Sequence, residues 1–288
     1  MSVDLPCSEL AEALGEDMAG SAPAAGGFLV VEQPGPWGRD AVRESGLRPV
    51  ADELETRAGA AGLKVHVVRR SVRRYAAEPA AAWVARVQPG ARSLVRFEVG
   101  SIGELLDLPL NRGGGTPQDR PLLLACTHST RDPCCARRGL PLHRALAAAG
   151  ADVWHASHLG GHRFAATMAV LPHGLWLGRV PAAEARAVVE AVEANRIPLP
   201  YVRGRAGAPP AAQAAELALR RREALDGLDD LLVAGADGDV VTLAAFDGRR
   251  WAVTMRHEPT ERHRPVSCGP GAKVEDPGRW IVADVATA

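Results

Sequence analysis

Apolar positions in the middle of the chain predict short strands that alternate with helices. Residues 121–127 (PLLLACT) and 151–157 (ADVWHAS) are apolar runs of the length that buried strands have. Residues 140–149 between them place apolar side chains at helical spacing. Residues 168–180 form two apolar runs around a turn with proline and glycine, which is typical of a hairpin. A helix is expected after Pro181, because proline is common in a first helical turn.

The first part of the chain repeats this order of elements. The corresponding segments are a strand at 27–33, a helix at 50–61, a strand at 63–70, a hairpin at 81–99 and a closing helix at 101–108. Each lies roughly 80 to 95 residues before its counterpart, which suggests duplication. We therefore expect an α/β fold of mixed α+β character, made of two tandem βαβ-ββα units that pack as one body.

Glycine- and proline-rich stretches divide the chain into parts. Residues 111–121 (NRGGGTPQDRP) and 203–213 (RGRAGAPPAAQ) have the composition of loose connections. We expect a degenerate first unit at 1–110, a linker at 111–120, a second unit at 121–203 and a small α+β appendage at 204–288. The elements expected in the appendage are a helix at 211–224, a hairpin at 240–256 that turns at Asp247–Gly248, and a final strand at 279–285. We interpret the appendage as a cover for a sheet edge, with a partner-binding or DNA-binding winged element as the alternative.

Composition narrows the classes of function. Lys+Arg and Asp+Glu both total 34, so no global basic field favours nucleic acid or a membrane surface. The start of the chain is acidic and lacks the pattern of a signal peptide, and no apolar run reaches the roughly 18 residues of a membrane span. We expect a soluble, cytoplasmic protein. Clustered cysteines in a reducing compartment indicate metal binding or redox chemistry rather than disulfides.

Two short motifs in the second unit carry candidate ligands. CTHSTRDPCC places Cys126 and Cys135 after one predicted strand, and SHLGGHRFA places His158 and His162 after the next. If the two strands are parallel neighbours, both loops leave the same end of the sheet. Thiolates and imidazoles suit an iron–sulfur cluster or zinc, and a [2Fe–2S] core needs two ligands for each iron. The residues alone leave open whether Cys134 or Cys135 is the ligand.

Other residues near the motifs have less specific interpretations. Gly160 and Gly161 would let the backbone approach bridging sulfides. Arg131, Asp132 and Arg163 are placed to contact the ligands. The remaining cysteines and histidines are interpreted as buried or incidental thiols and as surface or satisfied core histidines: Cys7, Cys268, His128, His143, His155 and His173.

The two motifs also resemble a known family. CTHSTRDPCCARRG and SHLGGHRFAATMAVLPHGLWLGRV are similar to the sucrase/ferredoxin-like family, whose members carry a thioredoxin-like ferredoxin domain. EQPGPWG (32–38) and RPVSCGP (264–270) extend the similarity. Together with the repeated order of elements, the resemblance implies two tandem thioredoxin-like ferredoxin units. By itself it implies a [2Fe–2S] site with two histidines. It implies Cys126, Cys135, His158 and His162 as ligands, which favours Cys135 over Cys134. It does not imply sugar hydrolysis, because no pair of acids is placed as a glycosidase needs.

These observations predict an electron carrier rather than an enzyme, with no catalytic residue. We expect both thiolates on one iron and both imidazoles on the other, a potential above that of plant-type clusters, and coupling of electron to proton uptake. No nucleotide- or flavin-binding loop is recognisable, so electrons are expected from a partner protein. The alternatives are a structural Cys₂His₂ zinc site and a cluster-based redox sensor with a partner-binding tail. Disulfide exchange by Cys134 and Cys135 is disfavoured, because a C-x-x-C motif is absent from the sequence there.

Overall fold

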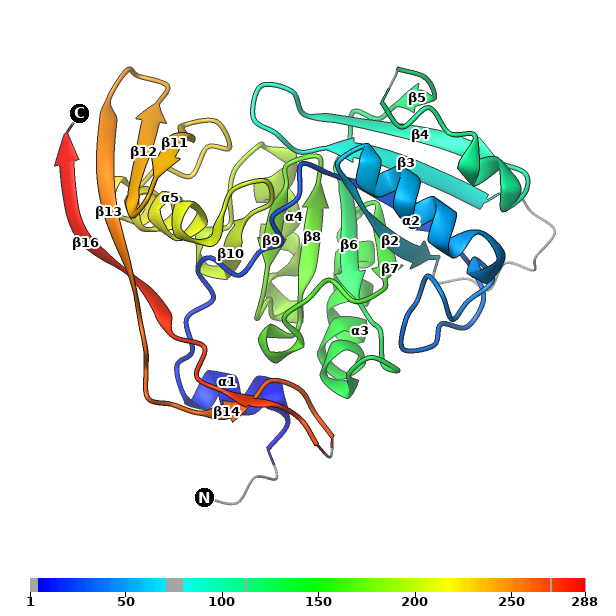
Figure 1. The fold of residues 1–288 in the computed structure, drawn as a ribbon, viewed down its shortest axis with the longest axis horizontal. Helices are drawn as coiled ribbons and strands as arrows, with labels where there is room; N and C mark the ends of the chain where they lie inside the picture. The colour runs from blue at the N-terminus through cyan, green and yellow to red at the C-terminus, as the bar shows by residue number, and fades with distance from the viewer. Residues whose placement is uncertain (1–4, 71–79, 112, 270, 288) are drawn as a thin grey trace.

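The computed structural model describes residues 5–70, 80–111, 113–269 and 271–287. Its main feature is a ten-stranded sheet with the order β10-β9-β8-β6-β7-β2-β1-β3-β4-β5 (Figure 1). The strands are β1 (Gly27–Glu32), β2 (Leu63–Arg69), β3 (Ala80–Arg86), β4 (Ser93–Val99), β5 (Thr116–Pro117), β6 (Leu122–Cys126), β7 (Val153–Ala156), β8 (Met168–Leu171), β9 (Leu175–Leu177) and β10 (Val202–Arg205). The α-helices are α1 (Cys7–Ala13), α2 (Ala51–Ala60), α3 (Pro133–Ala148), α4 (Ala185–Glu193) and α5 (Pro210–Glu223). The 3₁₀ helices are η1 (Arg48–Val50), η2 (Gly103–Leu106), η3 (His162–Phe164), η4 (Ala182–Glu184) and η5 (Leu199–Tyr201).

The two halves of the large sheet share one strand order. β2-β1-β3-β4 in the first half corresponds to β7-β6-β8-β9 in the second. In each half the first pair is parallel and the next two are antiparallel. β2 and β7 pair antiparallel and join the halves. The expected α/β fold with a mixed sheet is confirmed, whereas the origin of the halves as two thioredoxin-like units stays a prediction.

The large sheet is strongly curled. Phe28 on β1 and Trp176 on β9 are separated by four other strands in the sheet order. In a flat sheet their strands would lie about 24 Å apart, but the two ring centroids lie 4.7 Å apart. The concave face therefore closes around one apolar core, to which Trp83 and Trp154 also belong.

The convex face of the sheet is covered by helices. Side chains alternate across a strand, so Leu29 and Val31 of β1 face away from Phe28 and pack with α2. In the same way Leu123 and Ala125 of β6 pack with α3 and α4. The sheet is thus buried on both faces, which fits the nearly continuous apolar runs in its strands.

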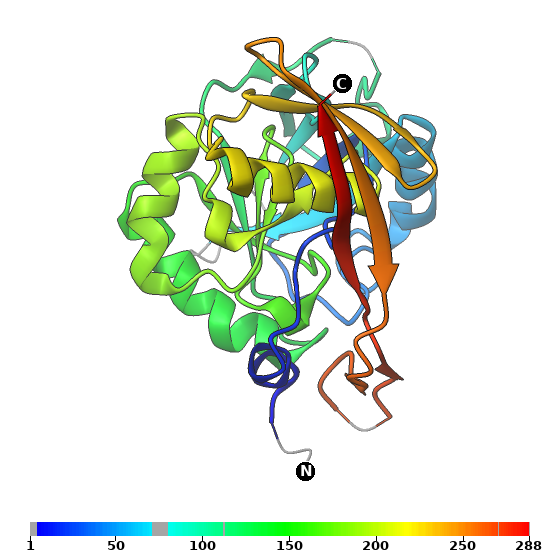
Figure 2. The ribbon, with the colours of Figure 1, turned by 90° about the vertical axis from the view of Figure 1, so that its left-hand side faces the viewer.

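A smaller body follows the large sheet. Its four strands have the order β11-β12-β13-β16 and are β11 (Leu231–Asp237), β12 (Val240–Ala245), β13 (Arg250–Glu258) and β16 (Arg279–Thr287). Helix α5 packs on this sheet through Ala215 and Leu219. β13 and β16 continue to a two-stranded piece, β14 (Arg264–Pro265) with β15 (Val274–Glu275), which contacts α1 (Figures 1 and 2). None of the helices in the described residues is long and apolar enough to cross a membrane.

Three expected elements are wrong in extent. Helix α3 begins at Pro133 rather than at residue 140, because Asp132 caps it and Pro133 suits a first helical position. Residues 203–213 are not a loose connection: they contain the edge strand β10 and the start of α5. The closing helix at 101–108 is only the short η2.

The division into four parts stays a prediction. The expected first unit includes residues 1–4 and 71–79, the linker includes 112, and the appendage includes 270 and 288. These residues lie outside the described part of the chain. Within the expected linker, β5 pairs with β4, so part of this segment extends the large sheet.

Candidate metal centre

The two motifs meet because their strands are parallel neighbours. β6 and β7 pair in parallel with Cys126 opposite Ala156, so Cys126 ends β6 where β7 also ends. His158 follows Ala156 by two residues. The expectation that both loops leave the same end of the sheet is confirmed.

Cys135 reaches this end of the sheet from the first turn of α3. The helix lies very close to β6, because a side chain at Gly139 would meet the carbonyl oxygen of Cys126 at 2.0 Å. The thiol sulfur of Cys135 is 3.8 Å from Nδ1 of His158. The ligand atoms of Cys126, Cys135 and His158 all lie within 4.8 Å of one another. Both cysteines are buried, and His158 is half-buried.

His128 positions the loop that carries His158. The backbone N–H of His158 donates to Nδ1 of His128 over 3.1 Å. Nε2–H of His128 then donates to the carbonyl oxygen of Gly38 over 2.8 Å. The sequence interpretation of His128 as a satisfied core residue agrees with these bonds but missed its contact with the loop. Its place two residues after Cys126 was the available signal.

His162 presents one ring nitrogen without a partner. Its Nε2–H donates to the carbonyl oxygen of Val266 over 2.6 Å. Nδ1 is buried and has no hydrogen-bond partner among the described residues. The rings of His158 and His162 have centroids 5.1 Å apart. A backbone carbonyl that fixes one ring nitrogen leaves the other as a lone-pair donor, as is usual for histidines that bind metals.

Gly161 allows a close approach to a buried arginine. Its backbone is left-handed, and a side chain there would meet the guanidinium of Arg203 at 2.6 Å. Arg203 donates to the carbonyl oxygen of Gly160 over 2.9 Å. Burial lowers the pKa of Arg203 to about 9, so it remains a cation at neutral pH. Arg203 places a positive charge beside the histidine loop, and no local motif predicted this contact.

The three polar neighbours expected at the site have different surroundings. Arg131 is exposed, and its side chain makes no hydrogen bond or ion pair with the described residues. Arg163 pairs with the buried Glu16, which also pairs with Arg264. Asp132 caps α3, and its Oδ2 lies 3.6 Å from Nε2 of His162.

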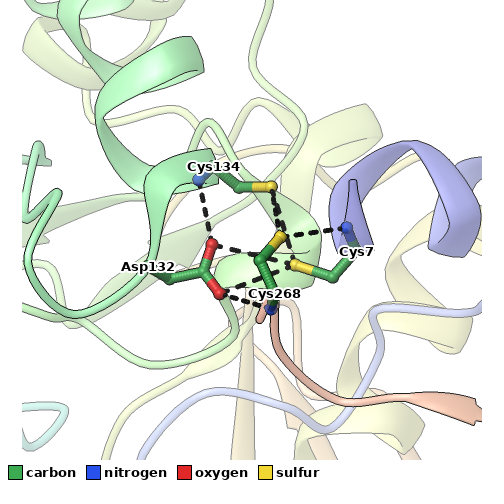
Figure 3. Close-up of side chains that lie close together, drawn as sticks. All are labelled: Cys7, Asp132, Cys134 and Cys268. Carbon is green, nitrogen blue, oxygen red and sulfur yellow. Dashed lines mark hydrogen bonds between the residues drawn. The ribbon is translucent and has the colours of Figure 1, made fainter. Parts of the chain in front are cut away.

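Cys134 faces a second group of side chains. Its sulfur lies 3.6 Å from that of Cys7 and 3.4 Å from that of Cys268, next to Asp132 (Figure 3). The side chains of the adjacent Cys134 and Cys135 therefore point to different groups, because consecutive side chains on a helix are about 100° apart. We call Cys7, Asp132, Cys134 and Cys268 the three-cysteine site. We call Cys126, Cys135, His158 and His162 the histidine site.

The two thiols of the histidine site influence one another's protonation. The hydrogen bond from the Cys135 thiol, followed by the contact with His158, holds the pKa of Cys126 well below its ordinary value despite burial. The same contact with Cys126, together with burial, raises the pKa of Cys135. One thiolate forms readily in this environment, and a bound cation would stabilise the second.

The histidine site fits a metal centre. Two thiols and an imidazole converge, and a second imidazole next to them has a buried nitrogen that no described residue satisfies. Soft thiolates with borderline imidazoles are the donors that iron–sulfur clusters and zinc prefer. Cys126 ends β6, Cys135 lies in α3 and the two histidines follow β7, so the fold brings donors from separate segments together.

The sequence matches one family model, described as sucrase/ferredoxin-like, over residues 18–204. This range covers more than half of the chain. The chain belongs to the sucrase/ferredoxin-like family. The matched range contains all of the histidine site, whereas Cys7, Val266 and Cys268 lie outside it.

Comparison with individual proteins adds one solved structure to the family match. No curated protein matches the sequence of this chain. A solved structure that resembles it is a thioredoxin-like [2Fe–2S] ferredoxin from Aquifex aeolicus. The identity is 16% and the TM-score 0.29, and the match covers 32% of this chain and 97% of the ferredoxin.

Proposed function

We propose that this chain is an electron-transfer protein with one [2Fe–2S] cluster held by the histidine site. The observation that carries the proposal is the convergence of Cys126, Cys135 and His158. The ring of His162 lies 5.1 Å from that of His158, and its buried Nδ1 has no hydrogen-bond partner among the described residues. Membership of the sucrase/ferredoxin-like family supports the proposal. When bound, such a cluster accepts and releases single electrons.

The surroundings favour a potential above that of all-cysteine clusters. Histidines in place of two thiolates raise potentials to about −150 to +300 mV in Rieske centres, against about −400 mV for plant-type clusters. Arg203 adds a buried positive charge near the loop of His162, which stabilises an added electron. The bond from His162 to Val266 orients that imidazole, and burial lowers its pKa, which favours the neutral form.

The proposed electron route passes through the histidine side of the site. The two cysteines are buried, whereas His158 is half-buried and the side chain of His162 is 14% exposed. Electrons would therefore reach the site from a partner protein that docks near these imidazoles. The same docking would serve a redox sensor, which is the alternative for this site.

The first experiment is anaerobic purification of the full chain, with iron, sulfide and zinc measured per chain. We expect a red-brown protein with about two irons and two sulfides, and an EPR signal of low average g after reduction. His162→Cys should keep the cluster but lower its potential by roughly 100 mV or more. His257→Cys, at an exposed histidine of β13, is the control and should leave the potential unchanged.

Two outcomes would contradict the proposal. A colourless protein whose zinc is lost in Cys126→Ser would mean a structural zinc site at these residues. An EPR spectrum and potential untouched by His162→Cys would remove His162 from the ligands. The proton coupling expected from the sequence stays a prediction, which measurement of the midpoint potential between about pH 6 and 10 addresses.

A further inference from the structure

Three cysteines and one aspartate meet on the other side of the first turn of α3. Cys7 begins α1, Cys134 lies in α3, and Cys268 lies between β14 and β15 (Figure 3). We propose that this three-cysteine site binds a single zinc ion. The proposal does not rest on the function proposed for the histidine site, because the two sites share no ligand.

The spacing of the ligand atoms suits one tetrahedral metal ion. Zinc–sulfur bonds of about 2.3 Å give sulfur–sulfur edges of about 3.8 Å in a tetrahedron. The sulfur of Cys134 lies 3.6 Å from that of Cys7 and 3.4 Å from that of Cys268. Both carboxylate oxygens of Asp132 are 3.9 Å from the sulfur of Cys7. The site is therefore close to the size of a four-coordinate zinc centre.

Two backbone N–H groups orient the carboxylate of Asp132. Its Oδ1 accepts from the backbone N–H of Cys134 and its Oδ2 from that of Cys268, both over 2.9 Å. Each oxygen keeps a lone pair, so the carboxylate can bind a cation without losing either bond. Asp132 is almost fully buried, and a buried negative charge is costly unless a cation is bound close to it.

Further hydrogen bonds point at the sulfurs. The backbone N–H of Cys7 donates to the sulfur of Cys268, and the hydroxyl of Ser8 donates to that of Cys134, both over 3.3 Å. Such donors stabilise thiolates and are typical of the surroundings of metal ligands. The N-terminus of α3 offsets part of the negative charge that three thiolates and a carboxylate place around Zn²⁺.

Zinc explains this set better than a disulfide or a second cluster. A disulfide would join two of the sulfurs and leave the third thiol beside the buried carboxylate of Asp132 with no cation to balance it. Cysteine and histidine are the usual ligands of iron–sulfur clusters, whereas zinc also accepts an aspartate. Three soft donors and one carboxylate at these distances favour a four-coordinate zinc ion. Binding would release the thiol protons to solvent and leave oxidation states unchanged.

A surface pocket gives a metal ion access to the three sulfurs. Its walls include Pro6, Leu10 and Arg137. Cys7 and Cys134 are buried at this pocket, whereas Cys268 is partly exposed on its loop. Cys268 is therefore the ligand that can be replaced with least disturbance of the core.

The decisive experiment starts from the full chain with Cys126→Ser and Cys135→Ser. This background removes the thiols of the histidine site, so every remaining cysteine belongs to the three-cysteine site. We expect about one zinc per chain after purification and about one equivalent of Co²⁺ bound after zinc removal. The cobalt form should have the visible bands of a tetrahedral thiolate complex.

Variants then identify the ligands. Cys268→Ser in the same background should weaken Co²⁺ binding about 100-fold or more. Asp132→Asn should also weaken it, although asparagine still caps α3. Ser267→Ala, beside Cys268 on the same loop, is the matched control and should bind as the background does. Circular dichroism would verify that each variant is folded.

The unmodified chain supplies an independent measurement. It should also contain about one zinc, and Cys268→Ser should remove that zinc without removing iron. Absence of zinc together with no binding of one Co²⁺ would overturn the proposal. So would a thiol count showing that two of these cysteines form a disulfide. Iron and sulfide are measured separately, so failure of the cluster proposal is distinguishable from failure of this one.

Discussion

Gly160 and Gly161 have the same left-handed backbone but different surroundings. A side chain at Gly160 would meet nothing within 4 Å, whereas one at Gly161 would meet the guanidinium of Arg203. Arg203 is buried and donates to Ser21 and to Gly160, so it cannot move away without losing these bonds. At the scale of single residues, the missing side chain of Gly161 therefore lets the histidine loop lie against Arg203.

We predict that Gly161→Ala destabilises the protein more than Gly160→Ala. The left-handed backbone should cost each variant about 1 kcal/mol. Displacement of Arg203 from its acceptors adds about 1.5–3 kcal/mol to Gly161→Ala alone. Denaturant unfolding of both variants measures the difference. Equal losses would mean that the contact between Gly161 and Arg203 contributes nothing to stability.

Helix α3 determines where the thiols of both sites lie. Asp132 starts the helix, and the next turn then directs Cys134 and Cys135 to different sides. Gly139 lets the helix lie against the end of β6, where Cys126 stands. The distance between Cys126 and Cys135 is thus set by helix–strand packing.

We predict opposite effects of alanine at two helical glycines. Gly59→Ala in α2 has open space and should stabilise the chain by about 0.5–1 kcal/mol through helix propensity. Gly139→Ala gains the same propensity, but its Cβ would overlap the carbonyl oxygen of Cys126. We expect a net loss of about 1–3 kcal/mol and reduced metal content. Thermal unfolding and metal analysis test both variants, and a stabilised Gly139→Ala would contradict this account of the packing.

At this scale the sequence predicted the strands better than the helix. The apolar runs at 121–127 and 151–157 were enough to predict β6, β7 and the meeting of their loops. The start of α3 was missed, because Gly139 is unfavourable inside a helix and Pro141 suits a first helical turn, so the pattern favoured a start at residue 140. Asp132 and Pro133 indicate a helix start by themselves, but the prediction relied on the apolar spacing after residue 140.

The partners of Cys134 could not be predicted from local pattern. Cys7 and Cys268 are separated by 261 residues and lie on opposite sides of the α3 motif in the sequence. Periodicity and spacing describe neighbours along the chain, whereas this site depends on how the first and last segments pack. Val266 and Arg203 escaped prediction for the same reason, since each acts through tertiary contact alone.

The whole molecule buries several histidines in neutral form. Among them, His173 lies in the turn between β8 and β9 and is 5% exposed. Burial, and then the nearby Arg92 and Arg205, lower its pKa to about 4. In the unfolded chain His173 binds a proton as the pH falls below about 6.5, whereas in the folded chain it stays neutral until about pH 4. The stability that depends on a neutral His173 is therefore fully present above pH 6.5 and is lost as the pH falls from 6.5 towards 4.

We predict that His173→Gln reduces the acid sensitivity of the fold. The unmodified chain should lose on the order of 3 kcal/mol through this residue between pH 6.5 and 4. The variant should lack that part of the slope, whatever its stability at neutral pH. His263→Gln, at an exposed histidine, is the control. Denaturant unfolding at several pH values gives the slopes, and identical slopes for His173→Gln and the unmodified chain would refute the prediction.

The segment around Val266 and Cys268 has a consequence for the timing of synthesis. Cys268 follows Cys134 by 134 residues, so a ribosome that adds about 5–20 residues per second makes it roughly 7 to 27 s later. During that interval His162 has no Val266 carbonyl to orient it, and Cys134 stands beside Cys135 without its later partner. A nascent chain thus offers a mixed set of thiols to any metal it meets. If both proposed sites bind metal, their surroundings are complete only once residue 268 has been made.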